Sequence, residues 1–322
     1  MNKPLIEVKN LRKYFPTPKG ILHAVDDISF SIMQGKTLGV VGESGCGKST
    51  TGRLLLRLIE PDAGNIFFEG QDILSLTSQK MRNVRRDIQL IFQDPYASLN
   101  PRMSIGETIA EPLLVNKIVK HGPELQKQIC KIMDIVGLAR NSINAYPHEL
   151  DGGRRQRVGI GRALVLQPKF IVCDEPVSSL DVSIQAQILN LMQDLQEEFK
   201  LTYLFITHDL SIVKHFADDI MVMYLGKIVE RAPSNMLFDN PQHPYTQALL
   251  SAIAVPSLDQ KYDRIKLKGE ISSPIDPPLY CRFAPRCMFA TDICFRSEPE
   301  LLCTEKSHEC ACFNHKNLIK QY

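Results

Sequence analysis

The clearest chemical signal in the chain is a glycine-rich segment at residues 42–50, which reads GESGCGKST. It fits the pattern G-x-x-x-x-G-K-[ST] and lies between an apolar run at 38–41 and a leucine-rich stretch at 51–58. Its glycines allow successive backbone N–H groups to point at one anion, and the following helix aims its positive dipole end there. Lys48 adds a cation for the outer phosphates, and Ser49 offers a hydroxyl to Mg²⁺. The segment predicts a nucleoside triphosphate site made by Gly42, Glu43, Ser44, Gly45, Cys46, Gly47, Lys48, Ser49 and Thr50.

Two carboxylates follow another apolar run. Residues 170–173 predict a buried strand, and Asp174 and Glu175 come directly after it. The carboxyl ends of strands in α/β sheets are where ligands bind. Downstream of a phosphate loop, the first carboxylate suits Mg²⁺ and the second lies near the attacking water. His208 follows the apolar run 203–207 in the same way, so we expect it at the same sheet edge in a catalytic role.

These residues need a sheet whose strands alternate with helices. Apolar and polar side chains alternate at 28–32, which predicts antiparallel strands within 5–34. Residues 104–137 have a helical pattern that Gly137 closes. Further strands are predicted at 38–41, 65–69, 88–92, 170–173, 203–207, 220–224 and 227–230, and further helices at about 51–58, 151–167 and 184–199. The alternation predicts a mainly parallel sheet with helices on both faces.

Length and composition describe an ordinary globular protein. The 322 residues suffice for one large domain or two smaller ones, and 44% are hydrophobic and 23% charged. A net charge of +2 gives no basic footprint, so nucleic acid is not an expected partner. The sequence shows neither an apolar stretch long enough to cross a bilayer nor a signal peptide at its start. We therefore expect a cytoplasmic protein that can dock on a membrane partner.

The order of the motifs resembles that of the nucleotide-binding subunits of ABC transporters over about the first 235 residues. The matching features are the phosphate loop, Gln93 after a strand, LDGGRRQRV at 150–158, the acidic pair, SSLD at 178–181, and His208. Within the family, three stretches are similar to the ATPase subunits of dipeptide and oligopeptide importers: QDPYASLNPR (93–102), YPHEL (146–150) and HPYTQALLSAI (243–253).

This resemblance implies a role for each matched residue. Residues 42–50 cradle the phosphates of ATP, and Glu175 polarises the attacking water. Gln93 senses the metal site and relays its state, His208 contacts the γ-phosphate, and Asp181 acts across a dimer interface. The implied Mg²⁺ ligands are Ser49, Gln93 and Asp174.

An aromatic ring near the start of such subunits stacks on adenine. Tyr14 and Phe15 are both candidates, and their sequence positions do not separate them. Taken alone, either ring on a strand is more often part of the core than a base-stacking group.

One matched stretch, the signature loop, departs from the family pattern. The family has Leu-Ser-Gly-Gly-Gln at the position of residues 150–154. Here Asp151 replaces the serine and Arg154 the glutamine, on either side of Gly152 and Gly153. In the family this loop caps the γ-phosphate held by the opposite subunit. A carboxylate 4 Å from that charge would be repelled by about 1–4 kcal/mol, which Arg154 can offset by bonding Asp151 or the phosphate. We expect the composite site capped by this subunit to be weakened or specialised.

A single phosphate loop makes the chain half of an ATP sandwich, since its signature lies too far along the chain to cap its own ATP in the family geometry. The expected partners are a second, non-identical ATPase subunit, two transmembrane permease subunits, and indirectly an extracytoplasmic substrate-binding protein.

Six of the nine cysteines lie between Cys281 and Cys312. In a reducing compartment such a cluster favours metal over disulfides. The stretch CRFAPRCMFATDIC resembles the tail of peptide-importer ATPases, some of which hold a [4Fe–4S] cluster. The resemblance implies ligation by Cys281, Cys287, Cys294 and Cys312, with Cys310 as the rival for the fourth position. Zinc is less expected, because the first three cysteines form no C-x₂₋₄-C pair, and a metal-free tail is the third possibility.

The expected protein is an α/β ATPase with a P-loop (RecA-like) core and a mainly parallel sheet. We expect an antiparallel β subdomain, an inserted helical subdomain at 94–161 within an ATPase domain at 1–240, and a Cys-rich extension at 241–322. The expected function is to power di- or oligopeptide import from the cytoplasmic face of the membrane. The alternatives are nickel or oligosaccharide as cargo, a non-transport ABC ATPase of translation or DNA repair, and a tail that acts as a metal-dependent sensor.

Overall fold

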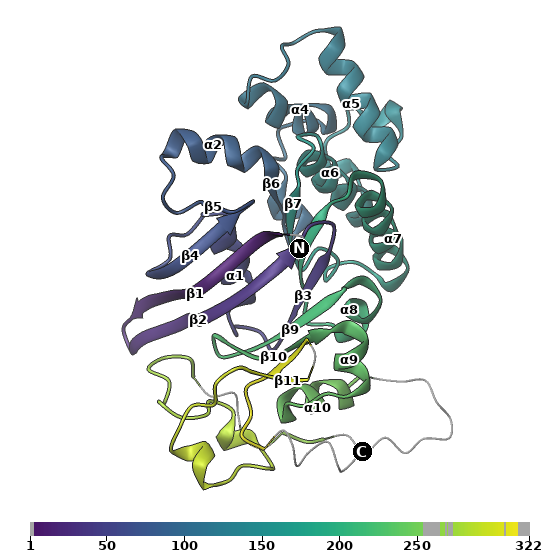
Figure 1. The fold of residues 1–322 in the computed structure, drawn as a ribbon. Helices are drawn as coiled ribbons and strands as arrows, with labels where there is room; N and C mark the ends of the chain where they lie inside the picture. Colours follow the sequence, from purple (N-terminus) through teal and green to yellow (C-terminus); the bar gives the residue numbers. More distant parts are fainter. Residues whose placement is uncertain (1–2, 254–264, 268, 270–272, 306, 315–322) are drawn as a thin grey trace, which may run out of the picture. The chain divides into compact units, whose positions relative to one another are not determined.

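The computed structural model describes residues 3–253, 265–267, 269, 273–305 and 307–314 (Figure 1). The chain forms two compact units. Unit 1 comprises Met1–Ile32, Thr37–Leu74 and Thr207–Tyr322, and unit 2 comprises Met33–Lys36 and Ser75–Ile206. Among the helices of the described ranges, none has the length and hydropathy needed to cross a membrane.

Unit 1 begins with an antiparallel sheet in the order β2-β1-β4-β5. Its strands are β1 (Pro4–Thr17), β2 (Gly20–Met33), β4 (Ala63–Phe68) and β5 (Gln71–Asp72). Ile28, Phe30 and Ile32 are buried whereas Ser29 is exposed, which is the alternation that predicted strands here.

A second sheet of unit 1 has the order β11-β12-β10-β9-β3. Its strands are β3 (Thr37–Val41), β9 (Asp219–Tyr224), β10 (Lys227–Pro233), β11 (Leu302–Glu305) and β12 (His308–Cys310). β3 and β9 are parallel, and the other pairs are antiparallel. The cysteine-rich tail therefore adds two strands to this sheet, next to β10.

The helical segments of unit 1 are short. They are α1 (Lys48–Leu55), α8 (Leu210–Phe216), α9 (Ser234–Asp239), α10 (Pro244–Ser251) and the 3₁₀ turns η3 (Ala284–Arg286) and η4 (Asp292–Phe295).

Unit 2 contains the parallel strands β8 (Thr202–Ile206), β7 (Phe170–Asp174) and β6 (Ile88–Ile91), paired in that order. Every residue of β7 and β8 is buried, as expected for parallel strands that are covered on both faces. The expectation of an α/β fold with strands alternating with helices is confirmed.

The helices of unit 2 are α2 (Ser78–Asp87), α3 (Pro95–Ser98), α4 (Ile105–Val115), α5 (Pro123–Ile135), α6 (Gly152–Leu164) and α7 (Val182–Phe199), with 3₁₀ turns η1 (Arg140–Ser142) and η2 (Pro147–Glu149). The continuous helical pattern expected at 104–137 is two helices. Lys117 has a φ of 55° and Pro123 opens α5, so neither continues a helix from the preceding residues. α2 was not predicted because it has one buried side chain, that of Met81.

Candidate functional site

The glycine-rich segment forms a loop between β3 and α1 in unit 1. Gly42 has a φ of 151°, and a Cβ there would lie 2.2 Å from the carbonyl oxygen of Met223. Gly47 has a φ of 106°, and its Cβ would lie 2.1 Å from the carbonyl oxygen of Ala24. Only glycine fits at both positions, since the neighbouring atoms belong to the backbone. The loop leads directly into α1, whose first N–H groups have no partner within the helix.

The Lys48 ammonium lies inside this loop. Its side chain donates hydrogen bonds to the carbonyl oxygens of Gly42 (2.8 Å) and Glu43 (3.0 Å), and the residue is 5% exposed. Ser49 and Thr50 follow in the first turn of α1 and are half-buried. A buried cation at the start of a helix is the arrangement that binds phosphate oxygens.

The carboxylates lie at the carboxyl end of β7 in unit 2. Asp174 is the last residue of β7 and is 8% exposed. Glu175 follows with a φ of 47°, in the left-handed region that non-glycine residues rarely adopt. Gln93 lies two residues past β6 and donates a hydrogen bond from Nε2 to Glu175 Oε2 at 3.0 Å. Strained backbone of this kind concentrates at functional sites.

The structure divides the expected site residues between the units. Unit 1 carries the phosphate loop and His208, whose imidazole is exposed beyond a turn in which the Thr207 hydroxyl accepts a hydrogen bond from the Asp209 N–H at 3.0 Å. Unit 2 carries Gln93, Asp174, Glu175, the signature and Asp181.

The departing signature residues pair with each other. Asp151 caps α6 by accepting a hydrogen bond from the Arg154 N–H at 2.7 Å, and Arg154 Nε lies 3.3 Å from the other Asp151 oxygen. Both side chains are more than half exposed. The two glycines between them leave little room for a side chain. A Cβ on Gly153, for example, would lie 2.6 Å from the Ile184 side chain. The aspartate thus fulfils the capping role of a serine while adding a charge that Arg154 balances.

Asp181 caps the next long helix, α7. Its carboxylate accepts hydrogen bonds from the Ser183 hydroxyl (2.7 Å) and the Ile184 N–H (3.0 Å). These bonds, led by the one from Ser183, lower the pKa of Asp181. It is exposed and ionised at neutral pH.

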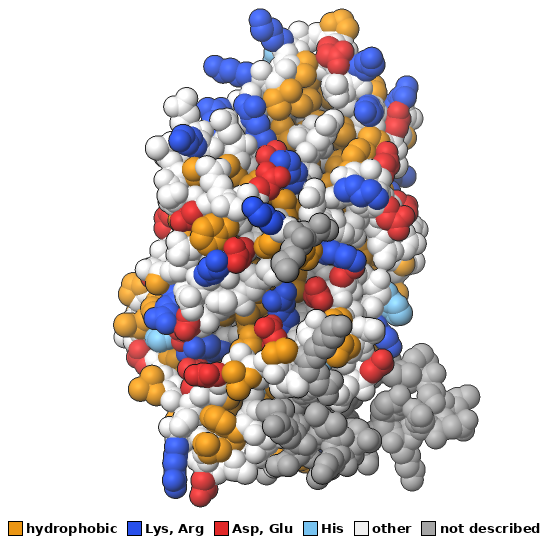
Figure 2. Space-filling model, in the orientation of Figure 1, with side chains coloured by type: hydrophobic (Ala, Val, Ile, Leu, Met, Phe, Trp, Pro, Cys, Tyr) orange, Lys and Arg blue, Asp and Glu red, His pale blue; other side chains and the backbone are white. Residues whose placement is uncertain are grey.

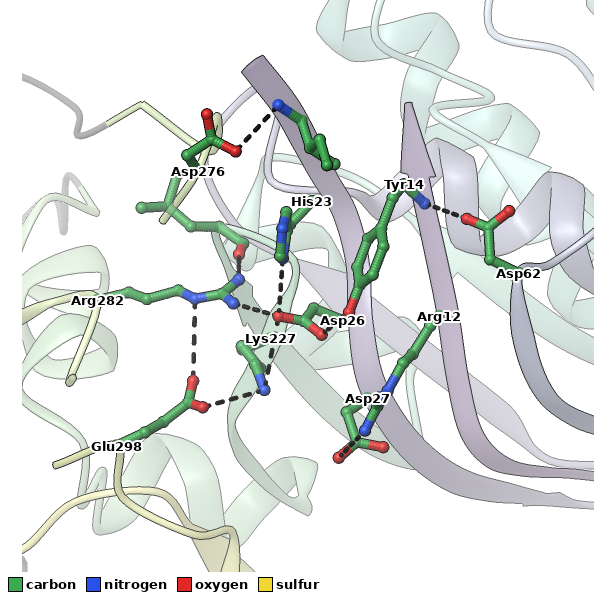
Figure 3. A network of polar contacts seen from close by, with 12 residues as sticks. Arg12, Tyr14, His23, Asp26, Asp27, Asp62, Lys227, Asp276, Arg282 and Glu298 are labelled. Carbon is green, nitrogen blue, oxygen red and sulfur yellow. Dashed lines mark hydrogen bonds and ion pairs between the residues drawn. The ribbon is translucent and has the colours of Figure 1, made fainter. Parts of the chain in front are cut away.

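Tyr14 and Phe15 differ sharply in their surroundings. The Tyr14 hydroxyl donates to Asp26 at 2.6 Å, and its ring stacks on His23 with centroids 4.1 Å apart (Figure 3). Burial, followed by the bond to Asp26, raises the pKa of Tyr14 to about 12. Phe15 is half-buried, and the Lys13 ammonium lies 5.3 Å from its ring centre. One face of the tyrosine is already covered.

A polar network missed by sequence reasoning joins β2 to the tail (Figure 3). The Arg282 guanidinium contacts Asp26 and lies 3.8 Å from Glu298, and Lys227 Nζ lies 3.3 Å from Glu298. Burial opposes ionisation of Asp26, but the Tyr14 hydrogen bond and the charges of Lys227 and Arg282 lower its pKa well below the usual range. Residues 256 apart in sequence leave no local signal for such a contact.

Four tail cysteines line one pocket, namely Cys281, Cys287, Cys294 and Cys312. Aromatic and apolar side chains, including Phe283 and Phe289, complete its wall. Burial raises the pKa of Cys281 to about 11 and that of Cys312 to about 12. Cys310, the rival fourth ligand, is absent from this lining and lies on β12. Within the described ranges, no three His, Cys, Asp or Glu side chains form a group placed to hold one metal ion.

The loop at the start of α1 and the Gln93–Glu175 pair at the ends of β6 and β7 define the class, an ATP-binding cassette. A family model for ABC transporters matches residues 25–178, and one for the C-terminal region of oligopeptide/dipeptide transporters matches 229–294.

Curated relatives match nearly the whole chain. The oligopeptide transport ATP-binding protein AppF of Bacillus subtilis (strain 168) is 50% identical over 318 residues, covering 96% of each chain. The dipeptide transport ATP-binding protein DppF of Haemophilus influenzae is 48% identical over 319 residues, covering 97% of each. The chain belongs to the ABC transporter family, among the ATP-binding subunits, and is an ATPase that uses ATP with Mg²⁺.

Solved cassettes share the fold. A dimeric, post-hydrolysis structure of the cassette MJ0796 with ADP and phosphate has a TM-score of 0.64 and 27% identity, covering 71% of this chain and 98% of that one. The cbiO1 cassette of Clostridium perfringens has a TM-score of 0.64 and 26% identity, covering 73% of this chain and 91% of that one.

Proposed function

We propose that this chain powers import of di- or oligopeptides, as a peripheral subunit on the cytoplasmic face of the membrane. The observation that carries the proposal is the joint presence of an ATPase site and a tail matching the C-terminal region of oligopeptide/dipeptide transporters. The names of relatives that are about half identical along the whole chain support the same cargo class.

In the proposed mechanism the loop N–H groups and Lys48 bind the phosphates of ATP, and His208 contacts the γ-phosphate. Glu175 orients the attacking water and accepts its proton, while the Gln93 amide holds the Glu175 carboxylate in place. Ser49, Gln93 and Asp174 would hold Mg²⁺, which would supply positive charge for the phosphate being transferred. The oxygen donors of these side chains suit that ion.

A second ATPase subunit completes the site in this proposal. Asp151, Arg154 and Asp181 are exposed, so they are accessible to a nucleotide held by a partner. The MJ0796 cassette, with which this chain shares its fold, forms a dimer. The charged signature favours a heterodimer, in which a non-identical partner supplies the other cap.

The adenine is proposed to stack on Phe15. Tyr14 is held by Asp26 and His23, whereas Phe15 has no stacked aromatic partner among the described residues. Stacking on an aromatic ring is worth about 1–3 kcal/mol per base.

The cysteine pocket is proposed to hold a [4Fe–4S] cluster through Cys281, Cys287, Cys294 and Cys312. Four thiols on three segments share a lining that contains no other ionisable group besides His243. Apolar walls and thiol ligands fit an iron–sulfur group, which would stabilise a tail that has little core of its own. We further propose a division into an ATPase domain at 1–240 and an extension at 241–322, which carries α10 and the cysteine pocket.

The proposed inserted helical subdomain, 94–161, offers a surface for the permease subunits. A groove of about 570 Å³ is lined by apolar parts of α4 and α5, including Ala110, Leu114 and Leu125. Val115, which also lines the groove, is 55% exposed, and Figure 2 shows hydrophobic side chains gathered in the helical part of unit 2. An exposed apolar groove of this kind suits a helix from a partner.

The experiment is to purify the chain with its detergent-solubilised membrane partners and to reconstitute them with labelled peptides, Ni²⁺ and an oligosaccharide. Peptide uptake that requires ATP is the expected result. Uptake of only nickel or only the oligosaccharide would reassign the cargo, and a chain that never co-purifies with membrane subunits would overturn the transport function.

A further inference from the structure

An arginine of the tail is bonded to the phosphate loop. Arg286 Nη1 lies 2.8 Å from Glu43 Oε2, and Arg286 Nη2 lies 2.9 Å from Glu43 Oε1. The arginine side chain is 7% exposed and the glutamate side chain 20%. The Tyr245 hydroxyl, from α10, accepts a hydrogen bond from the Glu43 N–H at 2.8 Å. Two-pronged contacts of this kind between charged groups are strong and fix orientation.

The same turn carries a cysteine of the pocket. Arg286 is the last residue of η3, and Cys287 follows it with its N–H donating to the Ala284 carbonyl at 3.2 Å. Phe283, just before η3, packs nearly perpendicular to the Tyr224 ring, with centroids 5.3 Å apart. One short turn therefore contributes a thiol to the cysteine pocket and a guanidinium to the phosphate loop.

The phosphate loop needs such a contact because Glu43 is an acid beside the predicted triphosphate site. An unpaired carboxylate there repels the phosphates, and the neighbouring Gly42 leaves the loop free to change conformation. The bond to Arg286 cancels the charge and draws the Glu43 side chain toward the tail, whereas Lys48 lies inside the loop.

We propose that Arg286 is a positioning residue for ATP binding, which neutralises Glu43 and fixes the loop, so that the cysteine-bearing turn sets the affinity for MgATP. The link to the state of the pocket rests on the proposed function of the four cysteines. The link between Arg286 and Glu43 does not.

The test removes the charges of Glu43 and Arg286 singly and together in the 322-residue chain, and measures the affinity for MgATP by calorimetry. Arg286→Gln should weaken MgATP binding about tenfold and leave adenosine binding unchanged, because only the phosphates feel the exposed carboxylate. The double variant Glu43→Gln/Arg286→Gln should recover to within about threefold of the unmodified chain. Arg296→Gln, an exposed tail arginine, is the matched control.

A double variant as weak as Arg286→Gln alone would reduce the arginine to a packing role and overturn the proposal, as would an Arg286→Gln chain with unchanged affinity. If Arg286→Gln does not fold, Arg286→Lys decides: it keeps a positive charge beside Glu43, so its MgATP affinity should stay within about threefold of the unmodified chain, and a larger loss overturns the proposal.

Coupling to the pocket is tested with Cys287→Ser. It should weaken MgATP binding in the unmodified chain but add nothing in the Glu43→Gln/Arg286→Gln background, since the contact is already absent. Equal losses in both backgrounds would overturn the coupling. An iron-free chain would overturn the cluster assignment, yet the Glu43 and Arg286 variants would still report on Arg286.

Discussion

The Gln93 amide and the Glu175 carboxylate lie 3.0 Å apart at the ends of two adjacent parallel strands. The left-handed backbone of Glu175 turns its side chain out of the line of β7, and the amide then holds one carboxylate oxygen. This is the arrangement expected of a base that must be oriented before water attacks.

Glu175→Gln should therefore lower ATP hydrolysis roughly 10²–10⁴-fold while MgATP binding persists, because the amide cannot accept a proton. Phosphate release and nucleotide affinity are measured on the same complex. Glu197→Gln, an exposed change on α7, should hydrolyse ATP at the normal rate. Normal hydrolysis by Glu175→Gln would contradict the assigned base.

Phe15→Ala should weaken ATP binding by at least about fivefold, the low end of the loss of one base–aromatic stack. Tyr14→Phe keeps the ring on His23 and removes only the hydroxyl, so it should bind ATP normally. Affinity for adenosine and for ATP reports the difference directly. Normal ATP binding by Phe15→Ala together with a loss in Tyr14→Ala would assign adenine to Tyr14.

The signature makes a prediction about charge balance. Arg154→Gln alone should slow hydrolysis in the assembled complex, because Asp151 loses the guanidinium that faces it. The double variant Asp151→Ser/Arg154→Gln should hydrolyse ATP at least as fast as the unmodified complex. Identical rates in all three complexes would show that this signature does not limit hydrolysis.

The cysteine pocket should give a brown protein with absorbance near about 400 nm from thiolate-to-iron charge transfer. Cys312→Ala should lose most of the iron and colour. Cys303→Ala, exposed on β11, should keep both, as should Cys310→Ala. Loss of iron in Cys310→Ala but not in Cys312→Ala would exchange the fourth ligand, and bound zinc in a colourless chain would replace the cluster.

His243 gives a pH prediction. Burial lowers the pKa of its imidazole from 6.5 to about 4, and Nδ1 accepts a hydrogen bond from the Tyr245 N–H at 3.1 Å. The unfolded chain binds a proton near pH 6.5 whereas the folded chain does not, so stability falls as pH drops from about 6.5 to about 4 and levels off below. The loss reaches up to about 3 kcal/mol.

Urea unfolding across that pH range measures the effect. His243→Asn keeps an acceptor at this helix start and removes the titration, so its stability should decline less steeply with acid. Parallel pH profiles for the two chains would contradict the assignment to His243.

Local sequence patterns predicted the core of this fold because β7 and β8 are almost continuous apolar runs, β2 alternates between apolar and polar residues, and the phosphate loop has a fixed spacing. β7 and β8 were predicted from their apolar residues alone, and their order along the chain placed Asp174 and Glu175 at a sheet edge. α2 escaped prediction because it fully buries one side chain, that of Met81, which leaves no apolar periodicity.

Long-range contacts were beyond the sequence. Arg286 bonds Glu43, which lies 243 positions earlier in the sequence. Tyr14 and Phe15 can be told apart as adenine-binding candidates only by their contacts in the folded chain. Neither fact leaves a periodicity or a motif. The sequence showed both the aspartate at 151 and Arg154 as its counter-charge, and the geometry of the α6 cap shows that the Arg154 guanidinium pairs with Asp151.

The strands that the tail adds beside β10 have one more consequence. Glu230 on β10 is fully buried, and its carboxylate lies 2.7 Å from His308 Nε2 on β12. Deleting residues 281–322 would remove His308 and leave the buried Glu230 carboxylate without that partner. It would also expose backbone N–H and C=O groups of β10 that β12 now pairs, and such an unpaired strand edge promotes aggregation. A truncated chain would therefore aggregate, so it could not test whether the tail acts as a sensor. Point substitutions of the pocket cysteines are the better test.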